Sequence, residues 1–205
     1  MTATAPTTRT ADERLARIRV PLAPMRGIYA RLMAAYSRRA FGDVLDGGYV
    51  LLHHKEVLRA DLAWERRIER WDALDEGLKM LAQLASAGVI GCSWCVDFGA
   101  FKGHESGLDL AKLREVPRWR ESDAFDARER RVMEYAEAMT VTPPEVTDAM
   151  VEALVGDLGV KAVVELTMMV AVENQRSRFN SAMGLTSQGF SDRCEVVSTG
   201  STSDG

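Results

Sequence analysis

The sequence has few cysteines, no long apolar run and almost no strand pattern, and each absence excludes a class of protein. Three cysteines in 205 residues are too few for a disulfide-stapled secreted scaffold. The longest apolar run, near residues 163–172, is interrupted by Glu165 and Thr167 and is too short to span a bilayer. Residues 1–13 are polar and lack the apolar stretch of a secretory signal. We therefore expect a cytoplasmic protein with no membrane partner.

An excess of positive charge is also missing. The formal net charge is −4 at pH 7 and the sequence pI is about 5.5. Nucleic-acid-binding domains usually carry a basic face, so nucleic acid is not expected as a partner. The apolar content of 46% and the charged content of 27% are those of an ordinary globular protein, and the length is sufficient for a sizeable core.

Composition divides the chain into three parts. Residues 1–13 are Thr-rich and polar, and the C-terminal tail ends in the small, polar residues 198–205, so neither segment can bury enough apolar surface to order itself. We expect a disordered N-terminus at 1–13, a single all-helical domain at 14–190 and a flexible tail at 191–205.

Helical periodicity and helix-end signals recur through the central part. Asp126 followed by Glu129 is typical of a capping box, and Gly184 is typical of a helix end. Strand signals are nearly absent, so the predicted fold class is all-α, a helical bundle that forms a homo-oligomer. The expected helices are one from residue 27 to a break at Gly42, one at 49–70 (or two meeting near His54), and others at 75–87, from 92, at 126–139, from 147 and at 160–183.

The motif with the clearest chemistry is Gly91-Cys92-Ser93-Trp94-Cys95. Two cysteines three residues apart lie one turn apart on the same helix face. If Gly91 ends one helix and Cys92 opens the next, the helix dipole and the unpaired N–H groups favour the thiolate of Cys92. This argument requires that Cys92 is partly exposed.

Three alternatives compete for the cysteine pair. The two residues could be buried cysteines that act as small apolar side chains. A zinc site needs four ligands, and neither a second Cys-x-x-Cys nor His53, His54 or His104 supplies the spacing. A thioredoxin-type motif is disfavoured because no strand precedes the pair.

Several segments together resemble one family. Their order and spacing are similar to those of the alkylhydroperoxidase D-like branch of the carboxymuconolactone decarboxylase family, over roughly residues 45–190. The segments that carry the resemblance are residues 78–87, 91–95, 119–122, 125–130, 135–140 and 174–180.

The resemblance implies an all-helical, oligomeric protein without a bound metal, flavin or other cofactor. It implies that Cys95 attacks a hydroperoxide, that Cys92 resolves the sulfenic acid as an intramolecular disulfide, and that a thiol reductant protein regenerates the pair. The dipole argument instead favours Cys92 as the more acidic thiol, so the two arguments assign the roles differently. We follow the family order, because helix ends are not fixed by sequence.

The chain departs from the family pattern at two positions. Met80 and Gly99 occupy the places where the family often has the Glu and His that are thought to relay protons. Possible substitutes are Glu76, one turn before Met80, and His104, beyond Gly99. Asp97 is a third possibility, although its spacing turns it to another helix face. For each of the three, a solvated surface position is the simpler expectation.

Other polar and aromatic residues have a structural interpretation first. Trp94 is expected in the core or at a subunit interface, and the histidine pair at 53–54 at a helix end or interface. Glu165 and Arg178 could form a buried ion pair or line a pocket, or could face solvent. Cys194 is expected to remain a thiol outside the pair.

The resulting functional hypothesis is a thiol-dependent peroxidase or disulfide reductase that acts on a hydroperoxide or disulfide substrate. The alternative is a non-enzymatic, redox-responsive oligomer that has lost the proton relay. A lactone decarboxylase is the weakest hypothesis, because its acid–base residues have no match in this sequence.

Overall fold

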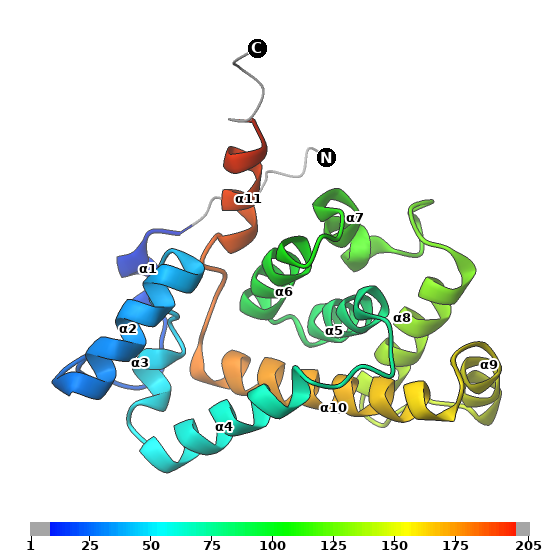
Figure 1. Cartoon of the computed structure of the whole chain (residues 1–205), viewed down its shortest axis with the longest axis horizontal. Helices are drawn as coiled ribbons and strands as arrows, with labels where there is room; N and C mark the ends of the chain where they lie inside the picture. Colours follow the sequence, from blue (N-terminus) through cyan, green and yellow to red (C-terminus); the bar gives the residue numbers. More distant parts are fainter. Residues whose placement is uncertain (1–8, 200–205) are drawn as a thin grey trace.

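The computed structural model describes residues 9–199, and all of its regular structure is helical (Figure 1). The predicted all-α class is therefore confirmed. The helices in chain order are α1 Ala11–Leu15, α2 Gly27–Phe41, α3 Gly48–Leu51, α4 Lys55–Ile68, α5 Glu76–Ile90, α6 Ser93–Glu105, α7 Leu110–Glu115, the 3-10 helix η1 Val116–Arg118, α8 Ala127–Thr140, α9 Asp148–Leu158, α10 Val160–Met183 and α11 Phe190–Thr199.

Most helix ends lie where the capping signals place them. Asp126 accepts the backbone N–H of Glu129, and the Glu129 side chain accepts that of Asp126, which completes the predicted capping box. Gly184 ends α10 with φ +78°, a conformation that glycine adopts without steric cost. Of the two arrangements expected for residues 49–70, two helices meeting near His54 is the one observed.

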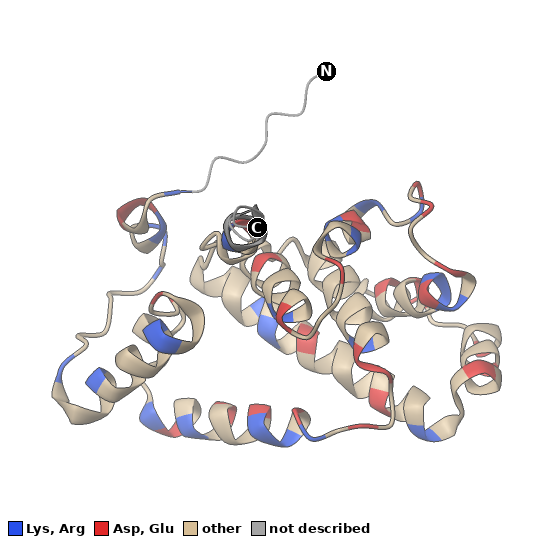
Figure 2. Ribbon diagram, turned by 45° about the horizontal axis from the view of Figure 1, so that its top comes forward, with Lys and Arg blue, Asp and Glu red and all other residues tan. Residues whose placement is uncertain are grey.

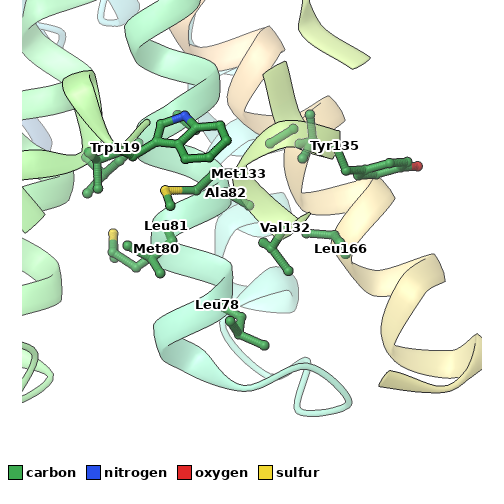
Figure 3. Close-up of a cluster of buried hydrophobic side chains, with 14 of the residues drawn as sticks. Leu78, Met80, Leu81, Ala82, Trp119, Val132, Met133, Tyr135 and Leu166 are labelled. Atoms are coloured by element: carbon green, nitrogen blue, oxygen red, sulfur yellow. The ribbon is translucent and has the colours of Figure 1, made fainter. Parts of the chain in front are cut away.

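Helix α5 forms the centre of the bundle and packs against α6, α8 and α10 (Figure 1). Its apolar stripe of Leu78, Leu81, Ala82 and Ala85 is buried, as are Met80 and Leu84. Burying one large apolar side chain stabilises a protein by about 1.5–3 kcal/mol, so this helix contributes much of the core. Figure 3 shows part of that core, with labelled side chains from α5, α8 and α10 and from the residue that follows η1. The labelled residues are Leu78, Met80, Leu81, Ala82, Trp119, Val132, Met133, Tyr135 and Leu166.

Helices α1–α4 form a separate arm at the N-terminal side of the bundle, and α4 runs alongside α10 (Figure 1). Ile68 at the end of α4 packs with Met169 and Val172 of α10. Acidic and basic residues are interspersed along α4, as Figure 2 shows. Among the described residues, no helix combines the length and the apolar character that crossing a membrane requires.

The outer face of α2 is apolar and exposed. Ile28, Leu32 and Tyr36, which recur at four-residue spacing, are 81%, 64% and 68% exposed. The helix expected from residue 27 is confirmed, but the described part of the chain does not cover its apolar face. The homo-oligomer expected from the sequence stays a prediction. Such an oligomer would have to explain the exposed apolar face of α2.

Two predicted boundaries are wrong. Residues 11–13 belong to α1, where Thr10 and Glu13 form a capping box, and residues 191–199 belong to α11. The tail orders because Phe190 is fully buried and because Arg193 donates to the carbonyl of Phe41 at 3.2 Å. The remaining parts of both expected flexible segments, 1–8 and 200–205, lie outside the described residues.

Candidate functional site

Cys92 and Cys95 lie at the turn between α5 and α6 and form a disulfide with a Cα–Cα distance of 5.3 Å. Gly91 ends α5 with φ +77°, and Cys92 is the N-cap of α6. The Cys92 Sγ accepts the backbone N–H of Cys95 at 3.2 Å. The predicted position of Cys92 at the start of a helix is therefore confirmed, and with it the favourable end of the helix dipole.

The expected partial exposure of Cys92 is wrong. Cys92 is 1% exposed and Cys95 is 7% exposed, and both pack with Ala87 and Trp94. Within this apolar surround, Asn180 near the end of α10 donates its amide N–H to Cys95 Sγ at 3.3 Å. One N–H donor thus points at each sulfur, and such donors stabilise a thiolate once the pair is reduced.

A buried polar track on α10 leads to Asn180. Glu173, Ser177 and Asn180 recur at helical spacing, and all three are buried. Ser177 donates to Glu173 Oε1 at 2.6 Å. Burial raises the pKa of Glu173, against the opposing charge of Arg176. Glu173 is therefore a protonatable group on the same helix face as the donor to Cys95.

Sequence reasoning missed Glu173, and it named Ser177 and Asn180 only within a resemblance. The signal available was three polar residues at helical spacing inside a helix that is otherwise largely apolar on that side. Arg176, which holds Glu173, is itself fixed by Glu65 on α4, from Arg176 Nε to Glu65 Oε1 at 2.8 Å.

The structure does not bring Glu76 to the cysteines. Glu76 is in the first turn of α5, at the end opposite Gly91, and its side chain is 60% exposed and 3.4 Å from Lys79 Nζ. Because a helix rises about 1.5 Å per residue, the fifteen-residue α5 places Glu76 about 20 Å from the turn that holds the pair. Glu76 therefore lies at the solvated surface, as expected.

His104 is also remote from the pair. It lies in the last turn of α6, nine residues after Cys95, and its Nδ1 is 3.4 Å from the carbonyl of Leu108. That separation corresponds to about 13 Å along the helix axis. His104 therefore contacts the backbone that follows α6 and not the redox pair.

Asp97 has an unexpected position, because it is buried rather than solvated. Its Oδ2 accepts the backbone N–H groups of Gln188 at 2.9 Å and Phe190 at 3.1 Å. Its Oδ1 accepts both the backbone N–H and the hydroxyl of Ser191 at 2.9 Å. With the hydroxyl of Ser187 at 2.9 Å, the carboxylate accepts five hydrogen bonds and fixes the start of α11.

The two departures from the family pattern, Met80 and Gly99, lie together in the core. A Cβ at Gly99 would lie 2.9 Å from Leu84 Cδ2 and 3.8 Å from Met80 Sδ. A Cβ at Gly103 would lie 3.0 Å from Met80 Cγ. Apolar atoms therefore fill the space in which the family's Glu and His would have to meet.

The remaining expected residues have structural roles. Trp94 is half-buried, stacks on Phe98 with ring centroids 4.8 Å apart and donates to Gln188. Glu165 pairs with Lys79 rather than with Arg178, whose guanidinium donates to the carbonyl of Thr140.

Cys194 and the histidine pair lie outside the redox site. Cys194 lies on α11, apart from the disulfide, with its Sγ 3.8 Å from the carbonyl of Phe190. His54 caps α4, which confirms its expected place at a helix end. Among the residues that the structure covers, no group of three His, Cys, Asp or Glu side chains is placed to hold a metal ion.

Replacing Glu173 with glutamine is expected to stabilise the protein at neutral pH. Because the folded-state pKa of Glu173 lies above its ordinary value of 4.5, its contribution to stability is present below that value and is lost as the pH rises. Glutamine keeps an acceptor for Ser177 and removes the buried charge. Urea denaturation at pH 7.5 and at pH 4 measures the effect, which should vanish at pH 4.

Glu152→Gln on exposed α9 is the matched control and should be neutral at both pH values. A Glu173→Gln protein that is less stable than the wild type at pH 7.5 would show that attraction to Arg176 outweighs burial.

The fold and the site together define a class: an all-helical protein with a Cys-x-x-Cys disulfide at the start of a buried helix. The model of the carboxymuconolactone decarboxylase family matches residues 56–138. The uncharacterized protein YnjA of Escherichia coli K12 is 39% identical over 165 residues, which are 78% of this chain and 88% of that protein. This chain belongs to the carboxymuconolactone decarboxylase family, as the resemblance predicted.

Solved structures share the fold. An alkylhydroperoxidase AhpD core protein, an uncharacterized peroxidase-related protein from Ralstonia eutropha JMP134, has a TM-score of 0.72 and 17% identity over 83% of this chain and 92% of its own. The debrominase Bmp8 has a TM-score of 0.73 and 16% identity over 85% of this chain and 95% of its own. At these identities the likeness concerns the fold alone.

Proposed function

We propose that this protein is a thiol-dependent oxidoreductase that reduces a hydroperoxide or a disulfide through Cys92 and Cys95. The observation that carries the proposal is the disulfide at the N-terminus of α6, with an N–H donor directed at each sulfur. A thiol at a helix N-terminus that closes reversibly with a neighbouring cysteine is typical of redox catalysis and redox sensing.

In the proposed peroxidase cycle the thiolate of Cys95 attacks the terminal oxygen of a hydroperoxide. The O–O bond breaks, Cys95 becomes a sulfenic acid, and the alkoxide takes a proton and leaves as an alcohol. Cys92 then attacks the Cys95 sulfur, and the S–O bond breaks with release of water as the disulfide forms. Two equivalents of a thiol return the pair to the reduced state and leave as their own disulfide. The order of the two roles follows the family resemblance, and the N–H of Asn180 is the donor that would stabilise the Cys95 thiolate in it.

The alternative function is a redox-responsive protein without turnover. It is supported by Met80 and Gly99, which fill the place of a proton relay with apolar atoms. Glu173 supports turnover instead, because it is a protonatable group on the same face of α10 as Asn180.

A thiol count tests the proposal. The reduced protein is treated with one equivalent of hydrogen peroxide, quenched, unfolded and titrated with a chromogenic thiol reagent. We expect the three thiols to fall to one and to return to three after dithiothreitol. Hydroperoxide consumption with dithiothreitol in excess measures turnover, which Cys95→Ser should abolish.

Tyr29→Phe on α2 is the control and should keep both the closure and the turnover. A pair that closes reversibly without consuming hydroperoxide would identify the redox-responsive alternative. A count that stays at three would contradict both.

A further inference from the structure

A cavity of about 590 Å³ opens beside the start of α6. It lies between the segment that follows α1, the end of α10 and the α5–α6 turn. The residues that matter to the argument are Arg9, Arg17, Arg19, Gly91, Ser93 and Thr186.

The lining of the cavity is positively charged, although the chain as a whole is acidic. Three arginines line it and no carboxylate does. Arg19 is held in place because its Nη1 donates to the carbonyls of Ser181 and Ala182 at the end of α10. Arg17 is exposed, and within residues 9–199 its side chain forms no ion pair. The cavity therefore has guanidinium charge available for an anion.

Thr186 also forms part of the lining. Its Oγ1 atom is buried from the cavity and has no hydrogen-bond partner among the described residues, so a ligand reaches it only if the side chain rotates. The arginines are therefore the groups that would bind an anion.

The cavity adjoins the disulfide. Gly91 and Ser93, which both line it, are the two chain neighbours of Cys92. A Cβ at Gly91 would meet no atom within 4 Å, so the space beside Gly91 is open. A small molecule held by the arginines would thus lie next to the turn that carries the redox pair. The two cysteines are 1% and 7% exposed, so attack on their disulfide requires a local opening of this turn.

We propose that this cavity binds the carboxylate of a low-molecular-weight thiol and so selects anionic thiols as the reductant of the disulfide. The inference rests on the proposed function, because it assigns the co-substrate of the same site. The bound thiolate attacks one sulfur of the Cys92–Cys95 bond, forms a mixed disulfide and releases the other cysteine as a thiolate. A second thiol attacks the mixed disulfide, leaves as the small disulfide and restores the second cysteine thiol.

Reduction by thiols of different charge tests the inference. The oxidised full-length protein is mixed with 3-mercaptopropionate, 2-mercaptoethanol or cysteamine, quenched with acid, alkylated and analysed by mass spectrometry. With rates expressed per thiolate, we expect the anionic thiol to react about tenfold faster than the cationic one at low salt. The preference should shrink in 0.5 M salt, where the screening length falls to about 4 Å.

Arg17→Gln and Arg9→Gln should each lower the ratio of the rate with 3-mercaptopropionate to the rate with 2-mercaptoethanol. Arg128→Gln, on an exposed position of α8, is the matched control and should behave as the wild type. Two cavity variants are used so that a folding defect in one, detected by circular dichroism, does not decide the result.

If all three thiols reduce the disulfide at equal rates, this inference is overturned and the proposed function remains intact. A preference that survives in both cavity variants would overturn it as well. A disulfide that none of the three thiols reduces in the folded protein would contradict both this inference and the proposed function.

Discussion

Asp97→Asn is expected to release α11 from α6 and to lower the free energy of unfolding by about 3–5 kcal/mol. The carboxylate accepts five hydrogen bonds from residues 187–191. An amide of the same shape turns one acceptor oxygen into a donor that faces N–H groups, so buried donors lose their partner. Chemical denaturation followed by circular dichroism measures the loss.

The matched control is Asp123→Asn, which changes the same group at an exposed position and should shift stability by less than about 0.5 kcal/mol. A loss below about 1 kcal/mol in Asp97→Asn would show that the N-terminus of α11 finds other acceptors at little cost. Asp97 is two residues from Cys95, so the same variant should make the disulfide more accessible to thiol reagents.

Lys79→Met is expected to lower the free energy of unfolding by about 3–5 kcal/mol, because it leaves a buried carboxylate without its partner. Lys79 Nζ lies 2.9 Å from Glu165 Oε1, and both side chains are more than nine-tenths buried. Glu165 also accepts the backbone N–H of Ala73 at 2.8 Å, which fixes the loop before α5. The double variant Lys79→Met/Glu165→Met should recover most of the loss, since it removes both charges.

The effect of Lys79→Met should depend on pH. Burial raises the pKa of Glu165, but the ion pair with Lys79 and the N–H of Ala73 outweigh it, so the folded pKa lies below its ordinary value of 4.5. A lowered carboxyl pKa contributes stability above the unfolded pKa, and this contribution is lost as the pH falls through the folded value. The difference between wild type and variant should therefore narrow below about pH 4.5.

Lys161→Met is the control for this experiment. Lys161 lies 3.9 Å from Asp72, but both side chains are more than four-fifths exposed, so a solvated pair contributes little. If Lys79→Met lowered the free energy of unfolding as little as Lys161→Met, the prediction would be contradicted. Water would then have replaced the buried ion pair without a loss of stability.

The parts of the fold that sequence predicts well are those whose causes are local. The capping box at Asp126, the glycine stop at Gly184 and the Cys-x-x-Cys turn each depend on residues within a few positions of one another. Helix α10 was bounded correctly for this reason.

The parts that sequence did not predict depend on distant partners. Asp97 has the spacing of a surface residue, and only the return of residues 187–191, ninety positions later, makes it a buried anchor. The start of α11 has the same cause, since Phe190 packs against Phe98 and Phe101 of α6. The row of buried polar residues from Glu173 to Asn180 is connected to the redox pair only by the hydrogen bond from Asn180 to Cys95 Sγ, which the sequence does not reveal.

The packing of Met80 against Gly99 constrains how this protein can evolve. A histidine at position 99 would collide with Leu84 and Met80, and a glutamate at position 80 would be buried against Gly99 and Gly103 without a cation. Each single substitution therefore passes through a destabilised intermediate, while the two together would be needed to exchange the apolar pair for a proton relay. The two positions are therefore coupled through the core, and a proton relay between them requires both substitutions together with repacking of Leu84.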